Sequence, residues 1–323
     1  MALGRVVVVG SFNIDHVWTV AALPRPGETL SGQYRTGPGG KGFNQATAAA
    51  RAGADTSFVC ALGDDSGGQL ARALAATDGI ALRDWVSSAP TGTAGIYVDA
   101  DGRNSIVIGP GANAALTPAF VADQAGLIAA AAVLLSQLES PVDAVVAAFE
   151  LARRSGVLTV LNPAPADALA PALLLSLADV ITPNESEFCA QLARHHGEPL
   201  AADTVATLDD ARLHALCRRL LPHGSVIVTL GAAGCFVSHA AALTRGDAVE
   251  SYRVAAEAVA VVDTTGAGDA FNGAFTASLA NAPSWPFAEH VRFANRYAAL
   301  STETAGAATS MPRRDEVFAR FPA

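Results

Sequence analysis

Two kinds of hydrophobic segment alternate along most of the chain. Residues 6–9 form a short β-branched run that ends at Gly10, which is typical of a strand buried on both faces of a sheet. Similar runs lie at residues 56–60, 132–137, 157–161, 180–182 and 225–230. Alanine- and leucine-rich segments of helical period lie between them, including residues 44–52, 68–76 and 209–221. The alternation predicts an α/β fold with a mostly parallel central sheet covered by helices on both faces.

Two regions depart from this pattern. Residues 15–37 read as short strands interrupted by polar residues and by Pro24, Pro26 and Gly27. Residues 92–108 form two alternating runs around Asp101-Gly102, which is a hairpin signal. We expect both regions to build a small β-sheet beside the main domain. Such a sheet near the strand ends could cover a ligand as a lid, and its edges could pair with a second subunit.

Composition and charge narrow the class of protein. The chain has 323 residues, of which 51% are hydrophobic and 16% charged, and its net charge is −9. This composition predicts a folded protein, and no basic run is present that would follow a nucleic-acid backbone. The longest apolar stretch, residues 125–138, is shorter than the roughly 20 residues that a spanning helix needs. With no signal peptide recognised and no C-x-x-C pair among the four cysteines, we expect a cytoplasmic protein that neither enters a membrane nor binds nucleic acid.

The strongest chemical signal is the segment DTTGAGDAFNG at residues 263–273, where an apolar run leads into a glycine-rich turn and then a helix. Backbone N–H groups of Gly266, Ala267 and Gly268 can converge at the positive end of this helix and form an anion hole. Asp269 then lies beside the anion, where a carboxylate can take a proton from a hydroxyl that attacks phosphorus. The alternative is that Asp269 only caps the helix.

A second glycine-rich segment, GPGGKGFNQA, occupies residues 37–46. It lacks the Ser or Thr that follows the lysine of a P-loop, and no short first strand leads into it as in a dinucleotide site. Lys41 is the only lysine of the chain, which favours a polar binding site at the start of a helix. Asp15, shortly after the first strand, lies in the zone where parallel sheets bind ligands and could accept bonds from two hydroxyls, or could simply begin a turn.

Two further segments follow predicted strands. In ITPNESE, Asn184 can cap a helix and Glu187 stands at the capping-box position. As a single motif it indicates capping more than catalysis. The turn that contains Gly231 and Gly234 is a weak signal by itself.

The order and spacing of these motifs resemble the ribokinase family of carbohydrate kinases. The segments GSFNID, GGKGFNQA, GPGANAALTP, LLSQLESP, LNPAPA, ITPNESE, VIVTLGAAG and DTTGAGDAFNGAF occur in the family's order over essentially the whole chain. The resemblance implies a three-layer ribokinase-like fold in a single domain, residues 1–323, with a lid sheet built from about residues 15–37 and 92–108. It also implies a homodimer formed through the lid sheets.

The resemblance assigns roles to individual positions. Asp269 would be the catalytic base, and Gly266, Ala267 and Gly268 would form the anion hole. The residues that would bind a small neutral sugar are Asn13, Asp15, Gly40, Lys41, Gly42, Asn44 and Glu139, with Asp269. ATP would be bound by Asn184, Thr229, Gly231, Gly234, Gly268 and Asn295.

Two cations are implied as well. Glu187 would organise Mg²⁺ through water. Activating K⁺ would be held by Asp263, Thr265, Ser301, Thr304, Gly306 and Ser310, several of them through backbone carbonyls. Phe43 and Ile14 replace smaller residues of the family beside the sugar motifs, so Phe43 either reshapes the pocket or packs into the core behind it.

The expected activity is ATP-dependent phosphorylation of D-ribose at its 5-hydroxyl. Within the same fold, the alternative substrates are another pentose, a ketohexose derivative and a nucleoside. The nucleoside stays open because four aromatic residues could stack on its base: Phe12, Trp18, Tyr34 and Tyr97. A non-catalytic sugar-binding regulator is a more remote alternative, and retention of Asp269 with its anion hole argues against it.

Overall fold

The computed structural model describes residues 3–168 and 170–322, and its centre is a nine-stranded sheet. The strand order is β13-β12-β11-β10-β9-β8-β1-β4-β5. The strands are β1 (Arg5–Val9), β4 (Asp55–Gly63), β5 (Ala81–Ser87), β8 (Val133–Ser136), β9 (Leu158–Leu161), β10 (Val180–Ile181), β11 (Ser225–Thr229), β12 (Cys235–His239) and β13 (Ser251–Val254). Neighbours pair in parallel from β5 to β11, whereas β12 and β13 are antiparallel. The predicted mostly parallel α/β sheet is therefore confirmed.

The sheet separates two hydrophobic cores, and β1 contributes to both. Val6 and Val8 pack into one core, while Val7 and Val9 pack into the other, as expected where successive side chains point to opposite faces. Helices that contribute to the first core are α1 (Lys41–Arg51), α2 (Ser66–Thr77), α10 (Ala267–Asn281), α11 (Phe287–Ser301) and α12 (Arg314–Arg320). The second core is covered by α3 (Pro118–Asp123), α4 (Ala125–Ala129), α5 (Val142–Arg154), α6 (Ala172–Leu177), α7 (Glu185–His196), α8 (Ala202–Val205) and α9 (Asp210–Leu220). Three 3-10 turns span Gly111–Ala115, Gly231–Ala233 and Ala308–Ser310.

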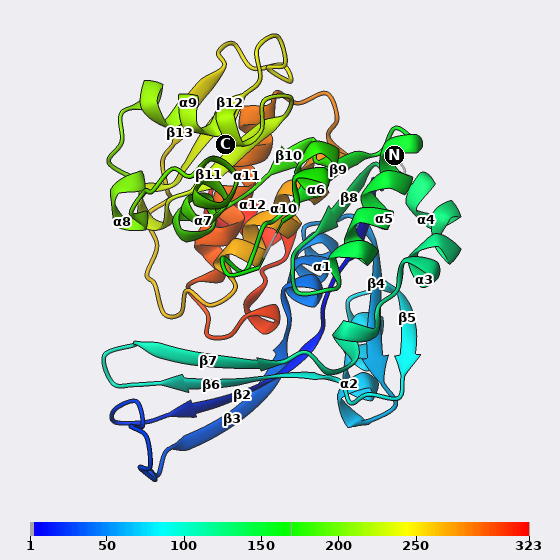
Figure 1. The fold of residues 1–323 in the computed structure, drawn as a ribbon, viewed down its shortest axis with the longest axis vertical. Coiled ribbons are helices and arrows are strands. Elements are labelled where there is room, and N and C mark those ends of the chain that lie inside the picture. Colours follow the sequence, from blue (N-terminus) through cyan, green and yellow to red (C-terminus); the bar gives the residue numbers. More distant parts are fainter. Residues whose placement is uncertain (1–2, 169, 323) are drawn as a thin grey trace.

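Helices α1 and α10 pack closely, and this contact positions the site. A Cβ on Gly273 would lie 2.4 Å from both the Ala48 Cβ and the Gln45 carbonyl oxygen. Only glycine therefore permits this approach. The N-terminal turns of the two helices, which come from distant parts of the chain, consequently meet at one end of the sheet (Figure 1).

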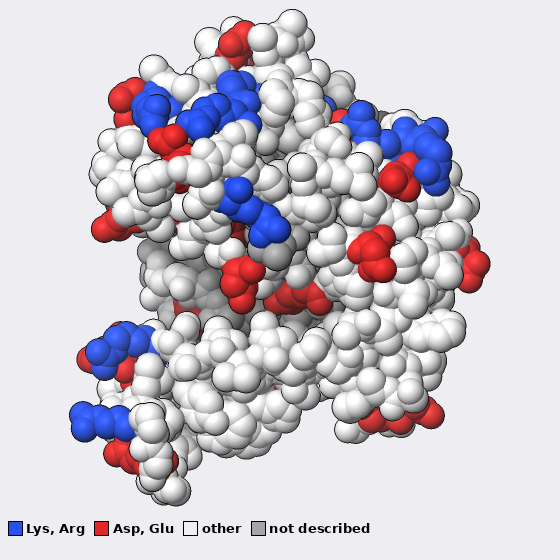
Figure 2. All heavy atoms as spheres, in the orientation of Figure 1, with Lys and Arg blue, Asp and Glu red and all other residues white. Residues whose placement is uncertain are grey.

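A second sheet of four strands stands off the main body (Figure 1). Its order is β3-β2-β6-β7, with β2 (Asn13–Thr19), β3 (Gln33–Gly39), β6 (Gly92–Val98) and β7 (Asn104–Gly109). The predicted hairpin around Asp101-Gly102 is present, since β6 and β7 pair antiparallel. Asp15 lies inside β2, so the reading in which it merely begins a turn was wrong. Acidic side chains are visible in the hollow between this sheet and the main body (Figure 2).

Several expectations about the chain can be compared directly with the structure. The strands predicted at residues 6–9, 56–60 and 225–230 correspond to β1, β4 and β11, whereas β5, β12 and β13 were missed. All four cysteines are buried free thiols. Among the described residues, no helix combines the length and apolarity needed to cross a bilayer.

Candidate active site

Asp269 lies in the first turn of α10, whose N-cap is Gly266. Gly266 has a φ of 77°, which favours glycine, and it turns the chain into the helix. A Cβ on Gly268 would meet open space, so this turn presents its backbone to the hollow. N–H groups and the helix dipole at this position suit an anion.

The Asp269 side chain is 6% exposed and both of its oxygens are hydrogen bonded. Asn44 Nδ2 donates to Oδ2 at 2.9 Å, and Gln45 Nε2 donates to Oδ1 at 2.8 Å. Burial raises the pKa of Asp269, while the Lys41 charge and the two amides oppose that rise. A raised pKa makes a carboxylate a stronger base.

Lys41 is the positive centre of this group of acids. Burial lowers the pKa of Lys41, but the surrounding carboxylates outweigh it and raise the pKa above its ordinary value. These carboxylates are Asp269, Glu139, Glu187 and Asp15. Lys41 therefore lies within the electrostatic reach of both the proposed sugar set and the proposed metal residue.

Asp15 is a further acid of this group, and its pKa is displaced to near neutrality. Burial, followed by the charges of Glu139 and Asp269, raises the pKa of Asp15 to about 7. Its carboxylate lies beside Gly39, where an added Cβ would approach within 2.2 Å of Oδ2. Gly39 therefore makes room for this side chain.

Glu139 joins the end of β1 to the start of α1. Its Oε2 accepts bonds from Ser11 Oγ at 2.6 Å and from the Lys41 backbone N–H at 2.9 Å. Gly40 precedes the helix with a φ of 85°, and a Cβ on Gly42 would lie 2.4 Å from the Ser11 nitrogen. Since both bonds go to Oε2, Oε1 is available for a ligand.

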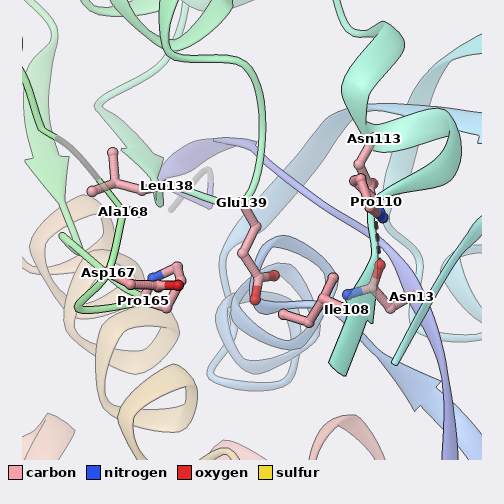
Figure 3. A pocket seen from close by; sticks show the side chains of 9 residues that line it. All are labelled: Asn13, Ile108, Pro110, Asn113, Leu138, Glu139, Pro165, Asp167 and Ala168. Carbon is pink, nitrogen blue, oxygen red and sulfur yellow. Dashed lines mark hydrogen bonds between the residues drawn. The ribbon is translucent and has the colours of Figure 1, made fainter. Parts of the chain in front are cut away.

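A cavity of about 270 Å³ adjoins this group (Figure 3). It is lined by Asn13, Ile108, Pro110, Asn113, Leu138, Glu139, Pro165, Asp167 and Ala168. Asn113 Nδ2 donates to Asn13 Oδ1 at 2.8 Å, which leaves Asn13 Nδ2 as the donor for a ligand. Asn113 and Asp167 were missed at the sequence level, although Asn113 lies in the recognised motif GPGANAALTP and Asp167 directly follows the recognised motif LNPAPA.

Four of the six proposed nucleotide residues lie at the ends of β10 and β11, whereas Gly268 and Asn295 lie on α10 and α11. Asn184 forms a β-bridge with Thr229, and the predicted capping box of Asn184 and Glu187 is present. Burial raises the pKa of Glu187. Gly231 and Gly234 flank the turn after β11. Asn295, on α11, donates to the Ala255 carbonyl at 2.6 Å and lies beyond β13.

The proposed K⁺ residues come from two segments that meet. Asp263 accepts bonds from the N–H groups of Thr265 at 2.9 Å and Gly306 at 3.0 Å. Ser301 and Thr304 lie at the end of α11, where the Thr304 N–H bonds the Ser301 carbonyl. Ser310 bonds the Ala307 carbonyl, and no described residue donates to the carbonyl of Gly306 or Ser310. The carbonyls of Gly306 and Ser310 thus remain available for a cation.

The side chain of Phe43 is 1% exposed and packs edge-on against Phe12, with ring centroids 5.1 Å apart. The structure therefore decides between the two sequence-level alternatives: Phe43 fills the core behind the sugar motif. The Ile14 side chain points toward Gly67 of α2, on the opposite face of β2 from Asp15.

Comparison with known proteins finds relatives that cover almost all of this chain. Residues 4–314 match the pfkB family of carbohydrate kinases. The ribokinase of Haemophilus influenzae is 41% identical over 314 residues, which are 96% of each chain. The solved ribokinase of Giardia lamblia has a TM-score of 0.87 at 31% identity and covers 99% of this chain and 98% of its own. Arabidopsis thaliana ribokinase, solved with ribose and ATP, has a TM-score of 0.83 at 32% identity and covers 100% of both chains.

Proposed function

This chain belongs to the pfkB family of carbohydrate kinases, and we propose that it converts D-ribose and ATP to D-ribose 5-phosphate and ADP. The observation that carries the proposal is the position of Asp269. This carboxylate belongs to the helix of the anion hole and is hydrogen bonded to Asn44 of the sugar motif. A base between a hydroxyl-binding set and a phosphate-binding set is what phosphoryl transfer requires.

In the proposed reaction, Asp269 removes the proton of the ribose 5-hydroxyl. The freed oxygen attacks the γ-phosphorus of ATP, a P–O bond forms, and the bond from the γ-phosphorus to the β–γ bridging oxygen breaks to release ADP. N–H groups of Gly266, Ala267 and Gly268 stabilise the charge on the transferred group. Asn13, Asp15 and Glu139 hold the sugar hydroxyls, with Gly40, Lys41, Gly42 and Asn44 around them.

The nucleotide and metal roles follow the clusters described above. Asn184, Thr229, Gly231, Gly234, Gly268 and Asn295 would contact ATP. Glu187 suits Mg²⁺ because a single carboxylate with waters and phosphate oxygens is a usual magnesium environment, and the metal supplies charge neutralisation at the phosphates. For K⁺, the available carbonyls of Gly306 and Ser310 fit an ion that prefers such oxygens; Asp263, Thr265, Ser301 and Thr304 complete the set.

The four-stranded sheet is proposed to act as the lid of the single domain. Asp15 pairs in register with Ala94, and Ala94 with Ile108, so these residues share the face that meets the cavity. The opposite face carries an aromatic group of His16, Trp18, Tyr34 and Tyr97. We place the homodimer contact on this apolar face. Tyr34→Asp should then shift sedimentation from dimer to monomer, and an unchanged dimer would refute the contact.

A neutral sugar fits the cavity better than the alternatives. Its lining includes Glu139 and Asp167 but no Lys or Arg, which disfavours a sugar phosphate. No aromatic side chain in the described part of the chain lines it, and Trp18 lies on the face of β2 opposite to Asp15, which disfavours stacking on a nucleoside base. Other pentoses and ketohexose derivatives remain to be separated by assay.

The test is a coupled assay of ADP release over ribose, other pentoses, ketohexoses and nucleosides, with and without K⁺ and Mg²⁺. We expect the highest kcat/KM with ribose and a requirement for Mg²⁺. We also propose that the enzyme is cytoplasmic and uses the cellular ATP pool. Absence of ADP release with every sugar would favour the regulator. Faster turnover of a nucleoside would refute the proposed substrate.

A further inference from the structure

Gln45 contacts Asp269 from the core side, and sequence reasoning assigned it no role. Its side chain is 0% exposed and lies next to Asn44 on α1. One N–H of Nε2 donates to Asp269 Oδ1 at 2.8 Å, and the other donates to Asn162 Oδ1 at 3.0 Å. The Gln45 Oε1 accepts a bond from Gln137 Nε2. The amide thus uses both donors and its acceptor.

The surrounding bonds fix which way this amide faces. Asn162 uses its own Nδ2 to donate to the Thr182 carbonyl, so its Oδ1 is the atom that faces Gln45. Gln45 must therefore present N–H groups on that side, and the same nitrogen reaches Asp269. Because Gln45, Gln137 and Asn162 are all buried, water does not compete for these bonds.

Asn44 and Gln45 divide the two oxygens of Asp269 between them, but their surroundings differ. The Oδ1 of Asn44 is buried and has no partner among the described residues, so it can accept a bond from a bound hydroxyl. Gln45 has no exposed surface and its polar atoms are all engaged. It can influence the reaction only through Asp269.

We propose that Gln45 is a positioning residue, which holds the Asp269 carboxylate in a single orientation and stabilises its ionised form without touching either substrate. This rests on the proposed role of Asp269 as the base. Four other charged groups act on the same carboxylate: Lys41 of α1, Glu139 after β8, Asp15 of β2 and Glu187 of α7. All four remain in a variant of Gln45, so a change in the proton affinity of Asp269 can be assigned to the lost amide.

The test is Gln45→Met, which keeps the length of the side chain and removes its donors. A hydrogen bond to a charged group corresponds to a displacement of about one pH unit. We expect the acid limb of the kcat–pH profile to move up by about that amount and kcat below the limb to fall about tenfold. KM for ribose should change less than twofold, because Gln45 does not touch the sugar.

Gln191→Met is the matched control. Gln191 is a buried glutamine of α7 that makes no bond to Asp269 and whose Oε1 has no partner within residues 3–168 and 170–322. The kcat–pH profile of this variant should therefore equal that of the wild type. A Gln45→Met enzyme with an unchanged acid limb and kcat, or with a loss confined to KM, would overturn the inference. If Gln45→Met does not fold, Gln45→Asn, which is one methylene too short to reach Asp269, is judged by the same criteria. The variant Asp269→Asn separates the proposal for the base from the proposal for Gln45. High turnover in Asp269→Asn would refute the role of Asp269 as the base. If Asp269→Asn is inactive and the Gln45 variant has a wild-type kcat–pH profile, only the role of Gln45 is refuted.

Discussion

Replacement of Asp269 by Asn tests the base directly, because the side chain keeps its shape and loses its charge. General-base catalysis contributes roughly 10²–10⁴ in rate, which is about 2.7–5.4 kcal/mol of activation free energy. The kcat of Asp269→Asn should therefore be lower than that of the wild type by roughly 10²–10⁴-fold. KM for ATP should stay near the wild-type value, since the N–H groups of the anion hole are unchanged.

The fold should survive this substitution. One N–H of the new amide would face Asn44 Nδ2 or Gln45 Nε2, and two opposed buried donors cost about 1–3 kcal/mol. Asn44 can reduce this cost by turning its amide, because its Oδ1 has no partner among the described residues. At about 2–4 °C per kcal/mol for domains somewhat smaller than this one, Tm should fall by a few degrees and unfolding should remain cooperative.

The measurements are ADP release under saturating ribose and ATP, and thermal unfolding of the same preparation. Asp143→Asn is a suitable control, since Asp143 is also in a first helical turn, that of α5, and it lies outside the site. It should retain full kcat. A folded Asp269→Asn enzyme with kcat within tenfold of the wild type would refute the assignment of the base.

Further predictions concern the sugar set, the loop after α11 and the glycines of α10. Because the pKa of Asp15 is raised to about 7, its carboxylate ionises as pH rises through neutrality, and KM for ribose should fall from pH 6 to 8. Asp15→Asn should abolish that trend and raise KM for ribose far more than KM for ATP. Arg51 pairs with a buried aspartate and also donates to three carbonyls at residues 308, 309 and 311. Arg51→Met should therefore lower the free energy of unfolding in urea by about 3 kcal/mol. Arg5→Met, which removes an exposed pair, should lower it by less than about 1 kcal/mol, and equal effects of the two substitutions would refute this reasoning. Gly268→Ala places a methyl group in the proposed anion hole and should lower kcat while Tm is maintained. Gly273→Ala should lower Tm, because its Cβ would lie 2.4 Å from atoms of α1. The reverse pattern would contradict both assignments.

The sequence by itself determined the class of fold, because buried strands and amphipathic helices have distinct hydrophobic periods. The runs at residues 6–9 and 225–230 predicted strands that the structure contains. The antiparallel strands β12 and β13 were missed, since CFVSH and SYRV mix polar with apolar residues and lack the continuous apolar run of β1 or β11. Motif order was also sufficient to indicate the family, because glycine-rich turns impose local backbone requirements that few other residues meet.

Only the tertiary structure decided which motifs share a site. Asn44 and Asp269 are 225 residues apart in sequence, and their hydrogen bond exists because Gly273 allows α1 and α10 to pack closely. The position of Phe43 was open until its ring was found in the core against Phe12. Gln45 could not be assigned any role from sequence, because a polar residue within a buried helical face acquires its function from partners on other segments of the chain, here α10 and the residues that directly follow β8 and β9.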